Sequence, residues 1–239
     1  MRLTQVTAML ELGGNAALRF LLGPTCAACE APLTEPLRSP VCSACWRAIA
    51  RLPPADHAGG PHAFEAAQSA GQYEGALRAI IHAFKYERRR VLAAPLAAMM
   101  RVAGAALLDD ADAVVPVPLH PWKRLTRGFN QADDLARHLG RPVWRVLRRR
   151  RHGPPQAGLP AARRHANVRD AFAARSRRVR GATVVLVDDV MTTGATLDAC
   201  GRALLAAGAR SVRALTVARA AAGRPLPPPP TPDPWTARR

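Results

Sequence analysis

The stretch Thr183–Thr196, TVVLVDDVMTTGAT, constrains the fold of this chain more than any other part of the sequence. It begins with an unbroken apolar run, Val184–Val187, which is typical of a strand buried on both faces of a parallel sheet. Two carboxylates follow, and then a small, hydroxyl-rich turn. Beyond the turn, apolar residues recur at helical spacing as far as Gly208, where we expect the helix to end. The stretch therefore predicts a strand–turn–helix unit of an α/β sheet.

This unit predicts a site for a phosphorylated ligand. Open α/β sheets bind ligands beyond the carboxyl ends of their strands. The turn amides and the positive end of the helix dipole hold a phosphate there, and threonine hydroxyls add donors. Asp188 and Asp189 repel a phosphate, but they can accept hydrogen bonds from ribose hydroxyls or contact a metal ion that the ligand brings. The predicted ligand is a sugar phosphate with free vicinal hydroxyls.

Two other interpretations compete for this stretch. A strand ending in Asp-Asp is also typical of the Walker B strand of nucleoside triphosphatases, which require a G-x-x-x-x-G-K-[ST] loop upstream. The only lysines are Lys85 and Lys123, and neither lies in such a loop. The other alternative is an ordinary connection with a solvated acidic turn, which does not account for the TTGAT sequence.

The charge of the chain is strongly positive, at +18, and almost all of it comes from arginine. Residues 141–180 contain thirteen arginines and one acidic residue, Asp170. Such a block favours a polyanionic partner, either nucleic acid or a phosphorylated small molecule, although a genome-wide bias towards arginine also contributes. Because no uncharged apolar span reaches eighteen residues and Glu11 interrupts any signal-peptide core, we expect a cytoplasmic protein without membrane insertion.

Four cysteines predict a metal site near the N-terminus. Two C-x-x-C pairs, Cys26 with Cys29 and Cys42 with Cys45, are separated by twelve residues, which matches a tetrahedral structural zinc site. Disulfides are disfavoured in a reducing cytoplasm, a redox pair would need a C-x-x-C that opens a helix, and an iron–sulfur cluster stays open. The fifth cysteine, Cys200, lies on the apolar stripe of the helix after TTGAT, and we expect it in the core.

A second predicted strand is also followed by a loop and a helix, as in the stretch Thr183–Thr196. Residues 113–118, AVVPVP, predict a strand, and the loop that follows carries Arg124 and Arg127 before a helix N-terminus. This arrangement is a second candidate for anion binding. Surface solubility is the alternative explanation for the two arginines.

The remaining elements are predicted from periodicity and composition. We expect an amphipathic helix around residues 77–84, one long buried helix at Val91–Leu108, strands at Val143–Leu147, Val168–Ala173 and Val212–Val217, and an irregular loop at 148–167. Such a long loop is usually a functional lid or disordered.

Specific motifs carry a resemblance to a known family. VVLVDDVMTTGAT resembles the phosphoribosyl pyrophosphate (PRPP) loop of type I phosphoribosyltransferases. The segments YEG…FKY, VPVPLH and RGFNQA, together with the cysteine quartet, Gln156 and Arg164, resemble the ComF family from about Cys26 to Arg219. The resemblance implies an α/β type I phosphoribosyltransferase fold, a parallel sheet flanked by helices, with a small N-terminal zinc-ribbon module. It also implies a link to natural competence and DNA uptake.

The resemblance also implies roles for individual residues. Asp188 and Asp189 would contact the ribose hydroxyls. The 5′-phosphate would be held by Thr192, Thr193, Gly194, Ala195 and Thr196, and the pyrophosphate loop would contain Arg124, Arg127, Gly128 and Asn130. Gln156 and Arg164 would act on the departing pyrophosphate from the lid, with Mg²⁺ bound to that group. Alanines at 157, 161 and 162 depart from the family's more polar loop.

The function predicted from the sequence is PRPP binding, with transfer of the phosphoribosyl group to an acceptor as the enzymatic form. Nitrogenous bases, ammonia and other acceptors stay open. The alternatives are a PRPP sensor without catalysis and a module associated with single-stranded DNA or competence proteins. We expect a helical lead (1–22), a zinc-ribbon-like module (23–52), a linker (53–70), a phosphoribosyltransferase-like domain (71–222) and a proline-rich disordered tail (223–239).

Overall fold

The structure is a computed structural model, and it describes residues 23–53, 62–119, 121–150, 171–175 and 177–220. Several predictions from the sequence lie outside these described residues. They are the helical lead, the proline-rich tail, residues 54–61 of the predicted linker, and most of the predicted lid, including Gln156 and Arg164.

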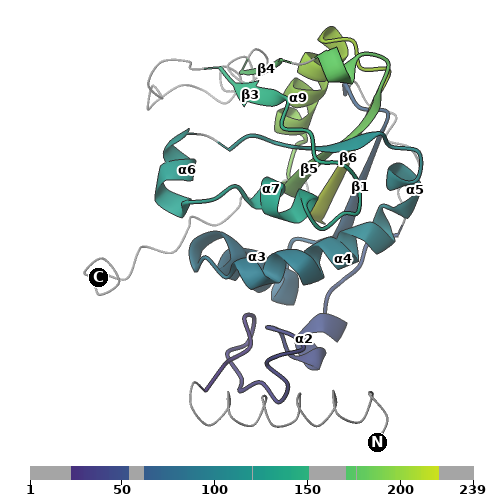
Figure 1. The fold of residues 1–239 in the computed structure, drawn as a ribbon. Coiled ribbons are helices and arrows are strands. Elements are labelled where there is room, and N and C mark those ends of the chain that lie inside the picture. The colour runs from purple at the N-terminus through teal and green to yellow at the C-terminus, as the bar shows by residue number, and fades with distance from the viewer. Residues whose placement is uncertain (1–22, 54–61, 120, 151–170, 176, 221–239) are drawn as a thin grey trace, which may run out of the picture.

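A parallel sheet of four strands forms the centre of the protein (Figure 1). Its order is β1-β6-β5-β2, and all three pairings are parallel. The strands are β1 (Ala66–Gln72), β2 (Ala113–Pro116), β5 (Thr183–Met191) and β6 (Ser211–Arg219). The first five residues of β5 are all buried, as its apolar run predicts for a strand covered on both faces. The predicted α/β class is confirmed.

Helices cover the two faces of the sheet (Figure 1). The helices α3 (Gly75–Tyr86), α4 (Ala93–Ala103) and α7 (Gln131–Ala136) pack on one face, and α9 (Ala195–Ala206) packs on the other. Side chains of β5 alternate between these layers, because Val185 and Val187 belong to the core on the α3 side, whereas Val184 and Leu186 belong to the core on the α9 side. Cys200 is fully buried in the α9-side core, as predicted.

The single long helix predicted at Val91–Leu108 is wrong. The structure has a short 3-10 helix, η1 (Arg90–Leu92), then α4, and then α5 (Ala105–Leu108). The break falls at Gly104, where an added Cβ would lie 2.5 Å from Leu215 Cδ1 of β6, so a side chain there would require Leu215 to shift. The helix is not buried all round either, since Val91 and Val102 are 65% and 73% exposed.

The strand β1 was not predicted, and its first residues lie in the segment expected to be a linker. Its sequence, AAQSAGQ, is small and polar, so it lacks the apolar pattern of a buried strand. The polar groups find partners only in the folded protein: Gln68 Nε2 donates to the Pro53 carbonyl at 3.0 Å, and the Ser69 and Thr216 hydroxyls lie 2.7 Å apart. Tertiary hydrogen bonds therefore make this strand possible.

The strand prediction at Val143–Leu147 is also wrong. Val143 makes only an isolated bridge to Val114, and the strand β3 begins at Leu147 (Leu147–Arg149). It pairs antiparallel with β4 (Phe172–Ala174), which overlaps the predicted strand Val168–Ala173 at its end. The strand prediction at Val212–Val217 is confirmed within β6. A short helix, α6 (Pro121–Arg127), lies where the sequence predicts a loop.

The N-terminal cysteine-containing segment packs against the α3 side of the domain. It contains the short helix α2 (Ser43–Arg47), and its residues Cys26, Val41 and Ile49 join the same core as Leu77 of α3. Within the described parts of the chain, no helix has the length and apolar character needed to cross a bilayer.

Candidate functional site

Asp188 and Asp189 lie at the carboxyl edge of the sheet, where β5 extends past β2. Strand β2 ends at Pro116, which pairs with Val187, and the Val117 N–H donates to the Val187 carbonyl at 3.0 Å before the chain turns towards α6. Strand β5 continues to Met191, and β6 is its one partner there among the described strands. Asp188 and Asp189 therefore lie on the strand itself rather than after it, beside the segment that leads to α6.

The two adjacent carboxylates lie on opposite sides of the sheet. Because strand residues alternate, Asp188 continues the row of Val184 and Leu186 on the α9 side, and Asp189 continues the opposite row on the α3 side. On that side the Nζ of Lys85, from the end of α3, lies 2.8 Å from Asp189 Oδ1. Asp188 Oδ1 instead accepts a hydrogen bond from the Asp189 N–H at 2.8 Å.

These surroundings shift the pKa values of Asp188 and Lys85. Burial, followed by the charge of Asp189, raises the pKa of Asp188 to about 7, while a backbone hydrogen bond and the charges of Lys85 and Lys123 oppose the shift. Burial also disfavours the charge of Lys85, but the charge and hydrogen bond of Asp189 outweigh it, and the pKa of Lys85 is raised. Asp189 is thus neutralised by a partner, whereas Asp188 titrates near neutral pH.

Cations gather around the acidic pair. Burial lowers the pKa of Lys123 on α6, and the nearby charges of Arg127, Lys85 and Arg149 lower it further. Burial also lowers the pKa of the Arg149 guanidinium. These cations repel one another, which makes it harder for each of them to hold its charge. A bound anion would relieve this repulsion, so the cluster is a candidate anion site.

The site contains two lysines, Lys85 and Lys123, for which the sequence had predicted no role. A signal for both was present, because they are the only lysines among 35 basic residues. A compact ammonium group at the end of a flexible stem fits a confined ion pair where a planar guanidinium does not. Because almost all other cations of this chain are arginines, the two lysines indicate positions where the smaller ammonium group is needed.

The turn after β5 has the form predicted for phosphate binding. Thr192 and Thr193 are exposed, and Gly194 adopts a left-handed conformation, with φ of +75°, directly before the first residue of α9. The Thr193 hydroxyl accepts a hydrogen bond from the Ala195 N–H at 3.4 Å, and Thr196 lies in the first turn of α9. The turn therefore presents hydroxyls and amides at the positive end of a twelve-residue helix.

The one carboxylate in that first helical turn is engaged elsewhere. Asp198 Oδ1 accepts a hydrogen bond from the Ala63 N–H at 2.7 Å, and Asp198 Oδ2 lies 2.5 Å from the guanidinium of Arg202. These partners offset its negative charge near the turn.

The residues predicted for the pyrophosphate loop have distinct places. Arg127 donates to Tyr86 Oη at 3.1 Å and lies over the same ring, 4.8 Å from its centroid, which ties α6 to α3. Asn130 donates to the Val117 carbonyl and accepts from the Ala132 N–H, so it closes the loop and caps α7. Gly128 forms a left-handed turn with φ of +77°. Arg124 lies in α6, with its side chain outside the described atoms.

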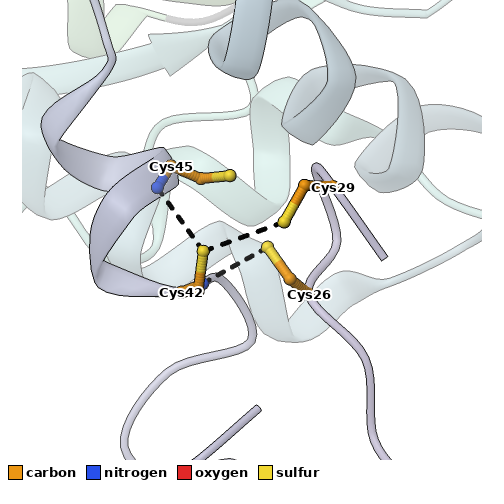
Figure 2. Close-up of side chains that lie close together, drawn as sticks. All are labelled: Cys26, Cys29, Cys42 and Cys45. Atoms are coloured by element: carbon orange, nitrogen blue, oxygen red, sulfur yellow. Dashed lines mark hydrogen bonds between the residues drawn. The ribbon is translucent and has the colours of Figure 1, made fainter. Parts of the chain in front are cut away.

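The four N-terminal cysteines converge, as predicted (Figure 2). Their sulfur atoms all lie within 4.8 Å of one another, and Cys29 Sγ lies 3.9 Å from Cys42 Sγ. A tetrahedron with zinc–sulfur bonds of about 2.3 Å has edges of about 3.8 Å, so the cluster has the size of a zinc site.

Backbone donors favour a thiolate at Cys26, one of the four cysteines. The N–H groups of Cys42 and Ala28 point at Cys26 Sγ, at 3.3 and 3.4 Å. Burial opposes ionisation of this thiol, but these backbone hydrogen bonds lower the pKa of Cys26 to about 6. Amide donors to sulfur are the outer-shell contacts that a metal-bound thiolate requires, so the residues present fit a structural zinc ion.

Comparison with known proteins identifies relatives over most of the chain. Residues 124–228 match the phosphoribosyl transferase domain family. Competence protein F of Haemophilus influenzae is 30% identical over 209 residues, covering 75% of this chain and 90% of that protein. DNA utilization protein YhgH of Escherichia coli strain K12 is 30% identical over 188 residues, covering 73% and 77%. Competence protein ComFC of Bacillus subtilis is 36% identical over 107 residues, 44% of each chain.

Proposed function

Because this chain belongs to the family of competence protein F (ComF), with a phosphoribosyltransferase fold, we propose that it binds PRPP and takes part in natural competence and DNA uptake. The observation that carries the proposal is the meeting of three groups at one edge of the sheet. These groups are the acidic pair of β5, the turn at 192–196 and the cations around Lys123.

Each group suits one part of PRPP. The ribose hydroxyls would donate hydrogen bonds to the acidic pair, for which Asp188 offers an oxygen on the α9 side of the sheet. The 5′-phosphate would lie against the amides and hydroxyls of the turn. The pyrophosphate, which carries Mg²⁺ with it, would lie near Lys123 and Arg127.

The corresponding reaction would be a displacement at C1 of the ribose. A bond forms between C1 and the acceptor as the bond from C1 to the pyrophosphate oxygen breaks, and the electron pair leaves with pyrophosphate. Cations fixed near the leaving group stabilise the charge that develops on it. Gln156 and Arg164 remain our proposed lid residues for this step. The same site without turnover would act as a PRPP sensor.

Calorimetric titration with Mg²⁺–PRPP tests the binding proposal directly. Asp188→Asn keeps the size of the side chain but removes a charged acceptor, which is worth about 1.5–3 kcal/mol, so affinity should fall roughly tenfold or more. Unchanged affinity would remove the sugar contact. Release of pyrophosphate with a panel of nitrogenous bases and ammonia then separates an enzyme from a sensor.

A second function is favoured by the surface of α6. Trp122 is 68% exposed there, next to Lys123, and exposed aromatics beside cations stack bases of single strands. We therefore also propose weak, sequence-independent binding of single-stranded DNA. Its affinity should fall steeply with salt and should drop in Trp122→Ala, and an affinity that stays flat with salt would contradict it.

We further propose that the cysteine cluster holds one structural Zn²⁺ and that the protein acts in the cytoplasm. All four ligand positions would be occupied by protein thiolates, so the ion would stabilise the N-terminal module and leave no open position for chemistry.

A further inference from the structure

Lys85 forms an ion pair with the Asp189 carboxylate and leaves the Asp188 carboxylate available for a ligand. The Lys85 and Asp189 side chains are 14% and 12% exposed, with 2.8 Å between Nζ and Oδ1. A charge so far removed from water is stable only with its partner. The pair also joins two separate elements, since Lys85 ends α3 and Asp189 lies near the end of β5.

An anionic ligand makes this neutralisation important. PRPP carries a phosphate and a pyrophosphate, and two uncompensated carboxylates beside it would repel both. Asp188 must nevertheless remain available to accept hydrogen bonds. Side-chain alternation places it on the α9 side of the sheet, and among the described residues its Oδ1 accepts a hydrogen bond from the backbone of its neighbour. A cation that neutralises one carboxylate and leaves the other to the ligand meets both requirements.

We propose that Lys85 is a positioning residue of this site: it holds Asp189 on the α3 side of the sheet and cancels its charge, so that Asp188 alone receives the ribose hydroxyls. This inference rests on the proposed PRPP binding and refines it, because it gives the two acidic residues different roles. Lys85 acts through Asp189 and does not itself contact the ligand.

The test is a double-mutant cycle in PRPP affinity, with Lys85→Met, Asp189→Asn and the double variant, each titrated with Mg²⁺–PRPP by calorimetry. In Lys85→Met, Asp189 is left as an unpaired negative charge beside the ligand, and affinity should fall about tenfold or more. Asp189→Asn should stay within about threefold of wild type. In the double variant the loss caused by Lys85→Met should disappear, because contacting residues couple in such cycles.

Two controls keep the outcome interpretable. Arg101→Met removes an exposed cation near the C-terminal end of α4, and it should leave affinity unchanged. Melting temperatures of all variants identify losses caused by unfolding. The double variant is the safer one in this respect, since replacing a buried pair as a whole is often neutral, whereas breaking it is not.

The possible results are distinct. Equal loss in Lys85→Met with and without Asp189→Asn would overturn the proposal and show that Lys85 contacts the ligand itself. A loss in Asp189→Asn as large as in Asp188→Asn would overturn the division of roles. Wild-type protein that fails to bind Mg²⁺–PRPP would instead refute the proposed function, and the role of Lys85 with it.

Discussion

Asparagine substitutions at the two adjacent acidic residues should change the stability of the ligand-free protein in opposite directions. The pKa of Asp188 is raised from 3.8 to about 7 by burial and by the charge of Asp189. One pKa unit corresponds to about 1.4 kcal/mol, so ionised Asp188 costs the folded state on the order of 4 kcal/mol above neutral pH. Asp188→Asn removes this cost. An amide is also penalised by burial, so we expect a net gain of about 1–3 kcal/mol.

The matched variant Asp189→Asn breaks a nearly buried ion pair. Lys85 would then lie 14% exposed without its counter-charge, and the loss of one partner of such a pair costs about 3 kcal/mol. For a chain of this size each kcal/mol corresponds to about 2–4 °C in melting temperature. At pH 8, Asp188→Asn should therefore melt several degrees above wild type, and Asp189→Asn several degrees below it.

The pH dependence of melting supplies an internal check. The pKa of Asp188 is higher in the folded state than in the unfolded chain, so its stabilising contribution is complete below pH 3.8 and is lost as pH rises to about 7. The advantage of Asp188→Asn over wild type should accordingly shrink between pH 8 and pH 5. Differential scanning calorimetry at the two pH values measures this difference in melting temperature between Asp188→Asn and wild type. Lower melting of Asp188→Asn at pH 8, or an advantage that grows at pH 5, would refute the reasoning.

Three further predictions concern other parts of the chain. Purified protein should contain one Zn²⁺ per chain, and Cys29→Ser should lose the metal and melt at a lower temperature. Metal analysis that finds no zinc in wild type, or zinc retained after removal of two of the four cysteines, would contradict the assignment. Gly201→Ala should destabilise the protein by about 1–3 kcal/mol, because its new Cβ would lie 2.8 Å from the Ala63 carbonyl oxygen. An unchanged melting temperature would show that the backbone at Ala63 moves away without cost. Arg164→Ala should keep PRPP affinity within a few-fold but slow pyrophosphate release about a hundredfold if Arg164 acts on the leaving group, and equal release rates with every acceptor would exclude the lid mechanism.

The sequence by itself determined those features that depend on neighbours along the chain. The run Val184–Val187, the acidic pair and TTGAT specify a strand, a turn and a helix in one continuous stretch, so the fold class and the family could be predicted from them. The convergence of the cysteines followed from their spacing for the same reason, because each C-x-x-C pair is a local motif.

Other features were decided by partners that are remote in the sequence. The strand β1 carries no apolar pattern and forms because Ser69 and Gln68 find hydrogen-bonding partners in the folded protein. The helix break falls at Gly104, whose Cα lies so close to Leu215 of β6 that an added Cβ would be 2.5 Å from Leu215 Cδ1. Local propensity does not contain either constraint.

The asymmetry of the acidic pair is the clearest case. In the sequence, Asp188 and Asp189 are equivalent neighbours, and we predicted one role for both. The structure extends β5 through them, so that the pleat turns them to opposite faces of the sheet, and it brings Lys85, more than a hundred residues earlier in the chain, to only one of them. Which carboxylate is neutralised is therefore a property of the packing of α3 against the sheet, which no local pattern encodes.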